Sequence, residues 1–309
     1  MTVLFIFLDG VGLGANDSSI NPFLRSELPN ISALLSGRKF ILSSTPFESK
    51  PVSFFSLDAS LGVSGIPQSA TGQATLLTGQ NIPSTIGYHY GPKPDKAITA
   101  LLFNGGIFGE LIKMGKTAAL LNAYPAAYFQ GIESGRRLFS AIPMAATQAG
   151  LRLFTHYDLI AGQAISADFT GQGWRDHQLL PEIPILAPLE SGELLVRLAK
   201  QFDFAFFEYW LSDYAGHGQD MSAAVSLLEN FDLILGGIIR SLQSDDLLLI
   251  TSDHGNLEDL STRRHTSNPV PLLLVGSKQN RQFFEEIKDI SGVAPSICRV
   301  IHSQFALKL

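Results

Sequence analysis

The sequence predicts an α/β fold organised around one largely parallel β-sheet. Short apolar runs alternate along the chain with segments whose apolar residues recur at helical spacing, a pattern typical of alternating strands and helices. The chain has 309 residues, which is enough for one large hydrophobic core. It contains no internal repeat and no low-complexity tract. We therefore expect one α/β core that carries an insertion.

Five apolar runs are the predicted strands, and helical spacing predicts helices between and after them. The predicted strands are Val3–Leu8, Thr117–Leu121, Phe202–Phe207, Asp246–Thr251 and Leu272–Val275. The predicted helices are Gly192–Lys200, Ser222–Leu242, Pro295–Ile301 and the shorter Phe108–Met114. In open α/β sheets, ligands bind beyond the carboxyl ends of the strands. Polar residues that follow these runs are therefore the first candidates for a functional site.

Composition and charge narrow the class of protein. The formal net charge of −6 and the isoelectric point near 5.6 argue against a general nucleic-acid binder, because such proteins usually carry an excess of Lys and Arg. The apolar amino terminus lacks a basic leader and runs into Asp9, which favours a buried strand over a secretory signal. No other segment is expected to span a bilayer. We expect a cytoplasmic protein with a small substrate and with no nucleic-acid or membrane partner, and we leave its oligomeric state open.

Seven polar residues lie in short segments that follow predicted strands or turns. Asp9 ends the first apolar run, and Asp253 and His254 directly follow another. Asp213 and His217 are four residues apart and come shortly after the run at 202–207. Because the carboxyl ends of parallel strands meet at one edge of a sheet, we expect these side chains to lie close together. The complete set is Asp9, Ser69, Asp213, His217, Asp253, His254 and His265.

These residue types predict a site for two metal ions. Carboxylates and neutral imidazoles are the ligands that divalent zinc or manganese takes when no thiolate is offered. Two cations roughly 4 Å apart can hold the attacking and leaving oxygens of an in-line phosphoryl transfer. The residues divide into a nitrogen-rich group of Asp213, His217 and His265 and an oxygen-rich group of Asp9, Asp253, His254 and Ser69.

Ser69 is the predicted nucleophile. A serine hydroxyl is weakly nucleophilic until a base or a metal ion lowers its pKa. The segment 66–73 resembles a turn that enters a helix, where free backbone N–H groups can also hold a phosphate. Thr71, two residues further on, is the alternative nucleophile.

Each segment also has an ordinary structural explanation. An Asp-Gly pair after a strand is usually a turn, and a serine in this setting is usually an N-cap. Asp213 and His217 can be only a hydrogen-bonded pair on a helix surface. A lone histidine such as His265 is more often structural. The joint occurrence of all seven residues is what favours a functional site.

The motifs around these residues resemble those of the alkaline phosphatase superfamily, most closely the phosphatase-type domain of cofactor-independent phosphoglycerate mutases. Phosphopentomutases have a similar pattern with a threonine nucleophile. Matching segments occur from the amino terminus to the last helix. The motifs are Asp9-Gly10, Ser69-x-x-Gly72, Asp213-x-x-Gly216-His217, Ser252-Asp253-His254-Gly255-Asn256-x-Glu258 and His265-Thr266-x-Asn268-Pro269-Val270-Pro271.

The resemblance implies an alkaline-phosphatase-like three-layer α/β/α core that binds two divalent metal ions, manganese or zinc. It also implies phosphoryl transfer through a phosphoserine at Ser69. By the same resemblance, the nitrogen-rich group would ligate one metal ion and the oxygen-rich group, with Ser69, would ligate the other.

The chain departs from the mutase pattern in two places. The mutases insert a substantial second domain soon after the nucleophile helix, whereas the segment 79–97 leaves no room for one. They also place a lysine after the strand that corresponds to 117–121, whereas residues 122–127 contain none. We therefore expect hydrolysis of a small phosphorylated metabolite. The alternatives are a phosphomutase of the phosphoglycerate or phosphopentose type and, in another class, a non-catalytic metal-stabilised binding module.

A segment at 138–181 is predicted to form a small cap over the site, with residues 1–137 and 182–309 forming the metal-binding core. The cap contains a probable helix at 139–149 and a Gly-rich stretch at 170–177 with Trp, Arg and His. Such side chains suit a substrate clamp, because Arg pairs with phosphate and Trp offers a flat apolar face. The candidate substrate-binding residues are Arg136, Arg137, Trp174, Arg175, His177 and Arg264.

Overall fold

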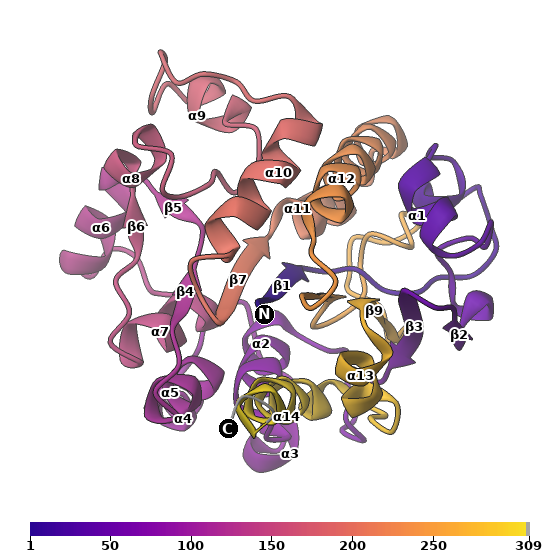
Figure 1. The fold of residues 1–309 in the computed structure, drawn as a ribbon, viewed down its shortest axis with the longest axis horizontal. Coiled ribbons are helices and arrows are strands. Elements are labelled where there is room, and N and C mark those ends of the chain that lie inside the picture. The colour runs from indigo at the N-terminus through magenta and orange to yellow at the C-terminus, as the bar shows by residue number, and fades with distance from the viewer. Residues whose placement is uncertain (307–309) are drawn as a thin grey trace.

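The protein, described over residues 1–306 by a computed structural model, is built on a central seven-stranded sheet with the strand order β2-β3-β9-β8-β1-β7-β4 (Figure 1). The strands of this sheet are β1 (Val3–Leu8), β2 (Phe47–Glu48), β3 (Val52–Leu57), β4 (Ala118–Leu120), β7 (Phe204–Tyr209), β8 (Leu247–Thr251) and β9 (Val270–Gly276). The four neighbouring strands β8, β1, β7 and β4 are parallel. The predicted α/β class with a largely parallel sheet is confirmed.

Helices cover both faces of the sheet and give it three layers (Figure 1). Every side chain of β1 is buried, as expected for a central parallel strand. Leu4, Ile6 and Leu8 face a first hydrophobic cluster that includes α1, α10 and α12. Val3, Phe5 and Phe7 of β1 face a second cluster that includes α2, α5, α7 and α14. The helices are α1 (Pro29–Leu34), α2 (Ser69–Thr78), α3 (Ile82–Ile86), α4 (Lys96–Leu101), α5 (Gly106–Lys113), α6 (Ala126–Glu133), α7 (Ala141–Gln148), α8 (His156–Ile160), α9 (Gln172–Asp176), α10 (Pro188–Ala199), α11 (Leu211–Gly218), α12 (Met221–Ser241), α13 (Lys278–Arg281) and α14 (Val293–Ala306).

The strand register brings several chain segments to one edge of the sheet. Leu8 at the end of β1 lies beside Tyr209 at the end of β7, and the Asp9 N–H donates to the Tyr209 carbonyl over 3.0 Å. Thr251 at the end of β8 lies beside Phe7 of β1. The residues that follow these three strands therefore leave the sheet next to one another.

The predicted strands and helices agree with the structure within a few residues, but two features of the sheet differ from the prediction. The run at Leu272–Val275 lies in β9, which is antiparallel to both of its neighbours. The strand β3 was not predicted, because its sequence mixes serines with the apolar residues and lacks a clear alternation. This strand extends the sheet beyond β9 and is followed by the short edge strand β2.

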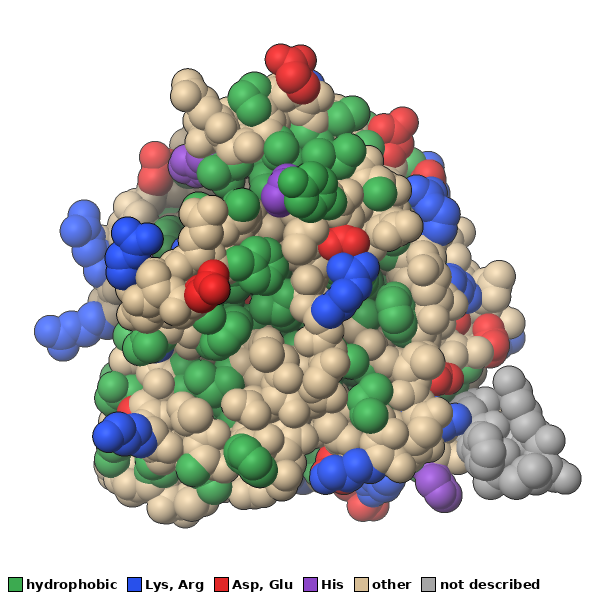
Figure 2. Space-filling model, turned by 90° about the vertical axis from the view of Figure 1, so that its left-hand side faces the viewer, with side chains coloured by type: hydrophobic (Ala, Val, Ile, Leu, Met, Phe, Trp, Pro, Cys, Tyr) green, Lys and Arg blue, Asp and Glu red, His purple; other side chains and the backbone are tan. Residues whose placement is uncertain are grey.

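The segment predicted as a cap, residues 138–181, contains α7, α8, α9 and the strand β6 (Phe154–Thr155), which pairs in parallel with β5 (Ala123–Tyr124). The helix α7 packs against α2 and α5, whereas α8 and α9 lie further out (Figure 1). Hydrophobic side chains gather on this side of the molecule (Figure 2), and the exposed ones in this stretch include Leu138, Tyr157 and Ile160. A mostly apolar cavity of about 540 Å³ lies between α8, the loop before α9, and α10. The division into core and cap stays a prediction.

Among the described residues 1–306, one helix has the length and composition of a membrane span. This helix is α12, which has 21 residues with a mean hydropathy of 1.5 in its most apolar window. Half of that window is buried inside the protein, and α12 packs along α10. A buried core helix passes the same test, so α12 is weak evidence for a membrane partner.

Glycines allow α10 and α12 to pack closely. A Cβ atom on Gly237 of α12 would lie 2.1 Å from the Leu189 carbonyl oxygen, and one on Gly192 of α10 would lie 2.1 Å from the Ile234 carbonyl oxygen. Both distances are shorter than a van der Waals contact, and the backbone atoms on either side cannot move independently to lengthen them. The two glycines therefore set the distance between the helices.

We predict that Gly237→Ala lowers the free energy of unfolding by about 1–3 kcal/mol, because the added methyl group pushes the two helices apart. Urea denaturation measures this change. Gly218→Ala is the matched control, since a Cβ atom there meets no other atom within 4 Å. The control is expected to be neutral or slightly stabilising. Equal stability of the two variants would contradict this account of the α10–α12 contact.

Candidate active site

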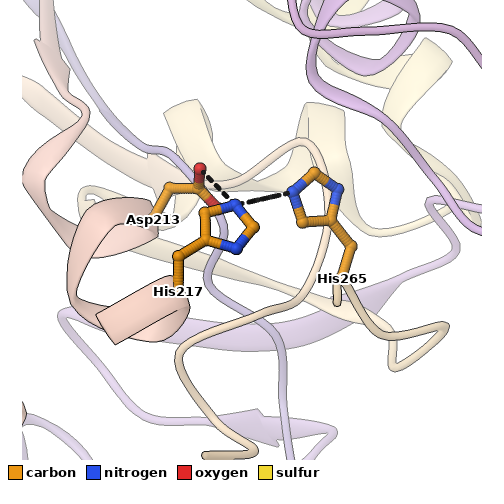
Figure 3. A group of neighbouring side chains, drawn as sticks. All are labelled: Asp213, His217 and His265. Atoms are coloured by element: carbon orange, nitrogen blue, oxygen red, sulfur yellow. Dashed lines mark hydrogen bonds and ion pairs between the residues drawn. The ribbon is translucent and has the colours of Figure 1, made fainter. Parts of the chain in front are cut away.

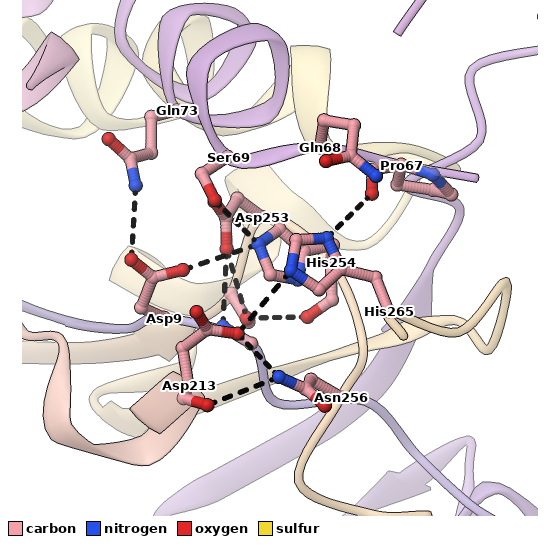
Figure 4. A network of polar contacts seen from close by, with 12 residues as sticks. Asp9, Pro67, Gln68, Ser69, Gln73, Asp213, Asp253, His254, Asn256 and His265 are labelled. Carbon is pink, nitrogen blue, oxygen red and sulfur yellow. Dashed lines mark hydrogen bonds and ion pairs between the residues drawn. The ribbon is translucent and has the colours of Figure 1, made fainter. Parts of the chain in front are cut away.

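The seven predicted residues come together at the edge where β1, β7 and β8 end (Figure 3 and Figure 4). Asp9 directly follows β1, and Asp253 and His254 follow β8. Asp213 and His217 lie on α11, which begins shortly after β7. Ser69 is the first residue of α2, and His265 lies in the loop before β9. Five separate chain segments thus supply the site.

His254 is the centre of the oxygen-rich group. Its Nε2 atom lies 3.0 Å from the Ser69 Oγ, 3.3 Å from the Asp9 Oδ1 and 3.5 Å from the Asp253 Oδ2. All four residues are buried. Apart from His254, neither of the two carboxylate oxygens has a hydrogen-bond partner among residues 1–306. Buried carboxylate oxygens without donors are the kind of group that a cation satisfies.

Asp213, His217 and His265 form the nitrogen-rich group (Figure 3). The His217 Nε2 lies 3.2 Å from the Asp213 Oδ2, and the His265 Nε2 lies 3.6 Å from the Asp213 Oδ1. The two imidazole Nε2 atoms are 3.3 Å apart. One ligand atom from each residue falls within 4.8 Å of the others, so a single divalent ion fits this group.

The second nitrogen of each imidazole is fixed by a backbone carbonyl. The Nδ1 atom of His217 lies 2.7 Å from the Arg263 oxygen, and that of His265 lies 3.0 Å from the Pro67 oxygen. The Nδ1 atom of His254 faces the carbonyl of the next residue at 3.3 Å. A proton on Nδ1 satisfies each carbonyl and leaves the Nε2 lone pair directed into the site. This is the usual arrangement of histidines that ligate metal ions.

Asp213 also reaches the oxygen-rich group, which the sequence did not predict. Ligand atoms of Asp9, Asp213 and His254 fall within 4.8 Å of one another. The His254 and His265 rings stack with their centroids 3.7 Å apart, so the two groups are adjacent. Asp213 therefore lies between them and can face either of two neighbouring cations.

Burial and mutual charge shift the pKa values of these groups in opposite directions. Burial raises the pKa of the Asp9 and Asp253 carboxyls, and the Asp9 charge further raises the pKa of Asp253. Burial lowers the pKa of His254, but the Asp253 and Asp9 charges outweigh it and raise the value to about 10. Burial, with the His254 charge, lowers the pKa of His265 to about 4. Bound protons thus neutralise the negative charge of the carboxylates in the metal-free protein. Divalent cations can replace these protons.

Three supporting residues were not among the predicted site residues. Asn256 donates to the Asp213 Oδ1 over 2.6 Å, and Gln73 donates to the Asp9 Oδ2 over 3.2 Å. The buried Glu258 carboxylate accepts hydrogen bonds from the loops after β1 and β8 and from the loop that carries His265. Its donors are the Gly12 and Asn256 N–H groups, both at 2.8 Å, the Asn268 amide at 3.0 Å, and the Thr266 hydroxyl. The signal for Asn256 and Glu258 is their place in the motif that follows β8.

The structure separates the two candidate nucleophiles. The Ser69 hydroxyl faces His254 (Figure 4). The Thr71 hydroxyl is fully buried, donates to the Gln68 carbonyl over 3.0 Å and accepts from the Tyr90 N–H over 3.2 Å. The Thr71 hydroxyl is therefore occupied by backbone hydrogen bonds, as in a structural residue, whereas the Ser69 hydroxyl has the surroundings expected of a nucleophile.

The candidate substrate-binding residues do not lie together. Trp174 is buried in the first hydrophobic cluster, and Arg175 donates to the Ile183 carbonyl over 2.7 Å. His177 and Arg264 are exposed. Arg136 is exposed and donates to the Ser134 hydroxyl, whereas the guanidinium of Arg137 lies 4.7 Å from the centre of the Tyr128 ring. Their proposed contacts with substrate stay predictions.

Residues 189–304 match the sequence model of the Metalloenzyme superfamily. A 2,3-bisphosphoglycerate-independent phosphoglycerate mutase from Moorella thermoacetica is 25% identical over 166 residues, which are 49% of this chain and 32% of the mutase. A second mutase of this name, from Syntrophotalea carbinolica, is 35% identical over 107 residues, which are 32% of this chain and 20% of that protein. The chain thus matches a third or less of the length of these curated relatives.

Solved structures share the fold. The alkaline phosphatase of the Antarctic bacterium TAB5 superposes with a TM-score of 0.54 at 14% identity, covering 97% of both chains. The phosphoglycerate mutase of Leishmania mexicana superposes with a TM-score of 0.50 at 12% identity, covering 97% of this chain and 95% of that one. The former has been solved as a variant with magnesium bound, and the latter at low cobalt concentration. These similarities show that the chain shares the fold of these proteins.

We predict that divalent manganese or zinc raises the melting temperature of the metal-free protein by several degrees and that a chelator reverses the rise. A site filled at about 100 times its dissociation constant adds about 2.7 kcal/mol of stability. Asp253→Asn is expected to stabilise the metal-free protein, because it removes a buried charge, and to reduce the metal-induced rise. His302→Ala, an exposed histidine on α14, is the control. A metal-induced rise of the same size in Asp253→Asn would contradict the assignment.

Proposed function

From its fold and its C-terminal sequence similarity to alkaline-phosphatase-like metalloenzymes, we propose that this chain transfers phosphoryl groups through a phosphoserine at Ser69. The same similarities confirm the predicted resemblance to phosphatases and phosphomutases. The observation that carries the proposal is the position of the Ser69 hydroxyl. It lies 3.0 Å from the His254 Nε2, beside two buried carboxylates that each have one oxygen without a hydrogen-bond donor among the described residues. A hydroxyl in such a place is available to a metal ion and to a substrate.

Two divalent ions, manganese or zinc, are the proposed cofactors. Asp213, His217 and His265 would hold one ion, and Asp9, Asp253, His254 and Ser69 would hold the other. When bound, such ions lower the pKa of a coordinated hydroxyl and neutralise charge on a phosphoryl group. The unpartnered oxygens of Asp9 and Asp253 and the three inward Nε2 lone pairs fit this cofactor.

The chain's own side chains would orient the reacting groups. The first residue of α2 fixes the Ser69 hydroxyl in front of His254, and Gln73, one turn further along the same helix, holds the Asp9 carboxylate. Asn256 holds the Asp213 carboxylate in the same way. Because each carboxylate has one oxygen fixed by a neutral amide, the other oxygen keeps its direction toward the site. This arrangement supplies the positioning on which phosphoryl transfer mostly depends.

Hydrolysis of a small phosphorylated metabolite is the leading reaction. A mutase must exclude water and return the phosphoryl group to its substrate, which requires a lid that closes over the site. Between α2 and α4 the chain has only the short helix α3 and loops, so the second domain of the mutase pattern has no counterpart there. The curated mutases match over a third or less of their length, which agrees with this difference.

A phosphomutase of the phosphoglycerate or phosphopentose type is the second candidate. It is favoured by the names of the sequence relatives, which are phosphoglycerate mutases. The predicted cap at 138–181 would then have to close the site.

A non-catalytic metal-stabilised binding module is the third hypothesis. The nitrogen-rich group argues against it, because three protein ligands leave a coordination position open to substrate, as in catalytic sites. We place the enzyme in the cytoplasm, with a small phosphorylated substrate.

Ser69→Ala is predicted to lower kcat by at least about 10³-fold, because it removes the nucleophile, while metal binding is largely retained. Thr71→Ser is the matched control and should keep most of the activity, since its hydroxyl can make the same backbone hydrogen bonds. Steady-state kinetics and metal content of the purified variants measure both effects. Loss of turnover in Thr71→Ala with activity retained in Ser69→Ala would identify Thr71 as the nucleophile.

A substrate panel separates the reactions. Sugar phosphates, phosphoglycerates and an aryl phosphate ester would be incubated with the manganese- or zinc-loaded protein, and free phosphate and isomers would be measured. We predict free phosphate that depends on Ser69. Isomerised product without free phosphate would establish the mutase instead. No turnover in the presence of tightly bound metal would favour the binding module.

A further inference from the structure

The cavity between α8, the loop before α9 and α10 is separate from the phosphoryl-transfer site, because none of the candidate metal ligands lines it. Its volume of about 540 Å³ falls within the range of roughly 300–1,000 Å³ that is usual for small-molecule sites. Protein interiors are otherwise close-packed, with few voids larger than a water molecule. A space of this size therefore calls for an occupant.

The walls of the cavity are mainly aliphatic. Leu159 and Ile160 of α8, Ile183 and Leu186 of the loop before α10, and Leu194 of α10 all line it. Ile183 and Leu194 are only 9% and 8% exposed, whereas Ile160 is 62% exposed. The cavity thus runs from a buried end to an apolar mouth at the protein surface. Such walls favour an apolar ligand.

Hydrogen bonds hold the walls of the cavity in place. The Leu186 N–H donates to the Thr170 carbonyl over 3.0 Å, which joins the loop after α9 to the loop before it. The Arg175 Nε–H donates to the Ile183 carbonyl over 2.7 Å, which joins the same loop to α9 itself. The cavity is therefore formed before any ligand binds, as is usual for small-molecule sites.

Phe169 forms part of the wall in a strained backbone conformation. Its φ of +63° lies in the left-handed region, which bulky residues rarely adopt. The side chain is buried, and its ring centroid lies 4.3 Å from that of Phe207 on β7. The preceding Asp168 carboxylate fixes the turn by accepting from the Gly171 N–H over 2.9 Å. Backbone strain of this kind persists only where the surrounding structure enforces it, and it is concentrated at functional sites.

Arg197 supplies a positive charge to the cavity lining. It lies three residues after Leu194 and therefore on the same face of α10. The residue is exposed, and its guanidinium makes no hydrogen bond or ion pair with any other of the residues 1–306. Glu182 also lines the cavity, but it is exposed to water and does not pair with Arg197. The Arg197 stem can lie along the apolar wall while its N–H donors remain available to an anion.

We propose that this cavity is a second ligand site, which binds the acyl chain of a fatty-acid-type carboxylate and pairs the carboxylate group with Arg197. A flexible hydrocarbon chain suits the aliphatic walls, and a guanidinium forms two parallel hydrogen bonds with a carboxylate. A cationic amphiphile would meet a like charge at Arg197, and an uncharged one would lack the ionic contact. The inference goes beyond the proposed phosphoryl transfer, because Ser69 and the candidate metal ligands take no part in it.

The first test is titration calorimetry of the full chain with octanoate, decanoate and dodecanoate. We expect the affinity to rise about fourfold for each added methylene group, because each one buries more apolar surface. Dodecanol should bind more weakly than dodecanoate, and dodecyltrimethylammonium more weakly still. Absence of binding, an affinity that does not change with chain length, or equal affinity for the anionic and cationic probes would overturn the proposal.

Substitutions separate the contribution of the chain from that of the carboxylate. Leu194→Trp should weaken dodecanoate binding at least about 100-fold, because the larger side chain occupies the space of the acyl chain. Arg197→Met should weaken dodecanoate binding about 10-fold, as expected for the loss of a hydrogen bond to a charged group, and should leave dodecanol binding unchanged. Arg240→Met is the matched control, since Arg240 is exposed on α12 and does not line the cavity.

Melting temperatures show whether the cavity-filling variant is folded. Ala164→Leu narrows the cavity from another wall and decides the question if Leu194→Trp does not fold. Unchanged dodecanoate binding in a folded variant of either kind would overturn the site. A dimer that Leu194→Trp breaks, without binding of any probe, would show instead that this face joins two copies of the chain. Ser69→Ala should bind dodecanoate as tightly as the wild type, whether or not the protein transfers phosphoryl groups.

Discussion

The convergence of Asp9, Asp213 and Asp253 at one edge of the sheet is the constraint on which the rest of the site depends. Two of these carboxylates are buried and each has an oxygen without a hydrogen-bond donor. Their charges raise the pKa of His254 to about 10, so the metal-free protein holds a proton in their midst. Buried like charges require a compensating cation. The same concentration of negative charge that is unfavourable in the metal-free protein would favour the binding of divalent ions.

The scaffold keeps these charges together by simple means. Parallel β1, β7 and β8 end side by side, so the residues that follow them meet without long loops. Glu258 then joins three of the converging loops through its two carboxylate oxygens. The first turn of α2 adds Ser69 to the site, and the loop before α4 is attached to that turn through Thr71 and Tyr90.

Much of this could be predicted from the sequence, because the informative residues stand at the ends of strongly apolar runs. The strand Val3–Leu8 was predicted with its exact bounds, and the residues after it and after β8 were predicted to meet. The antiparallel direction of β9 could not be predicted, because a fully apolar run does not encode strand direction.

The most direct measurement of the central claim is mass spectrometry of the metal-loaded protein, quenched with acid during incubation with an aryl phosphate ester. The account predicts that one phosphate is attached to the peptide that contains Ser69 and that fragmentation assigns it to Ser69. It also predicts that this species is absent when the metal ions are removed. Turnover without a phosphorylated protein, or with the phosphate on Thr71 or another residue, would contradict the account.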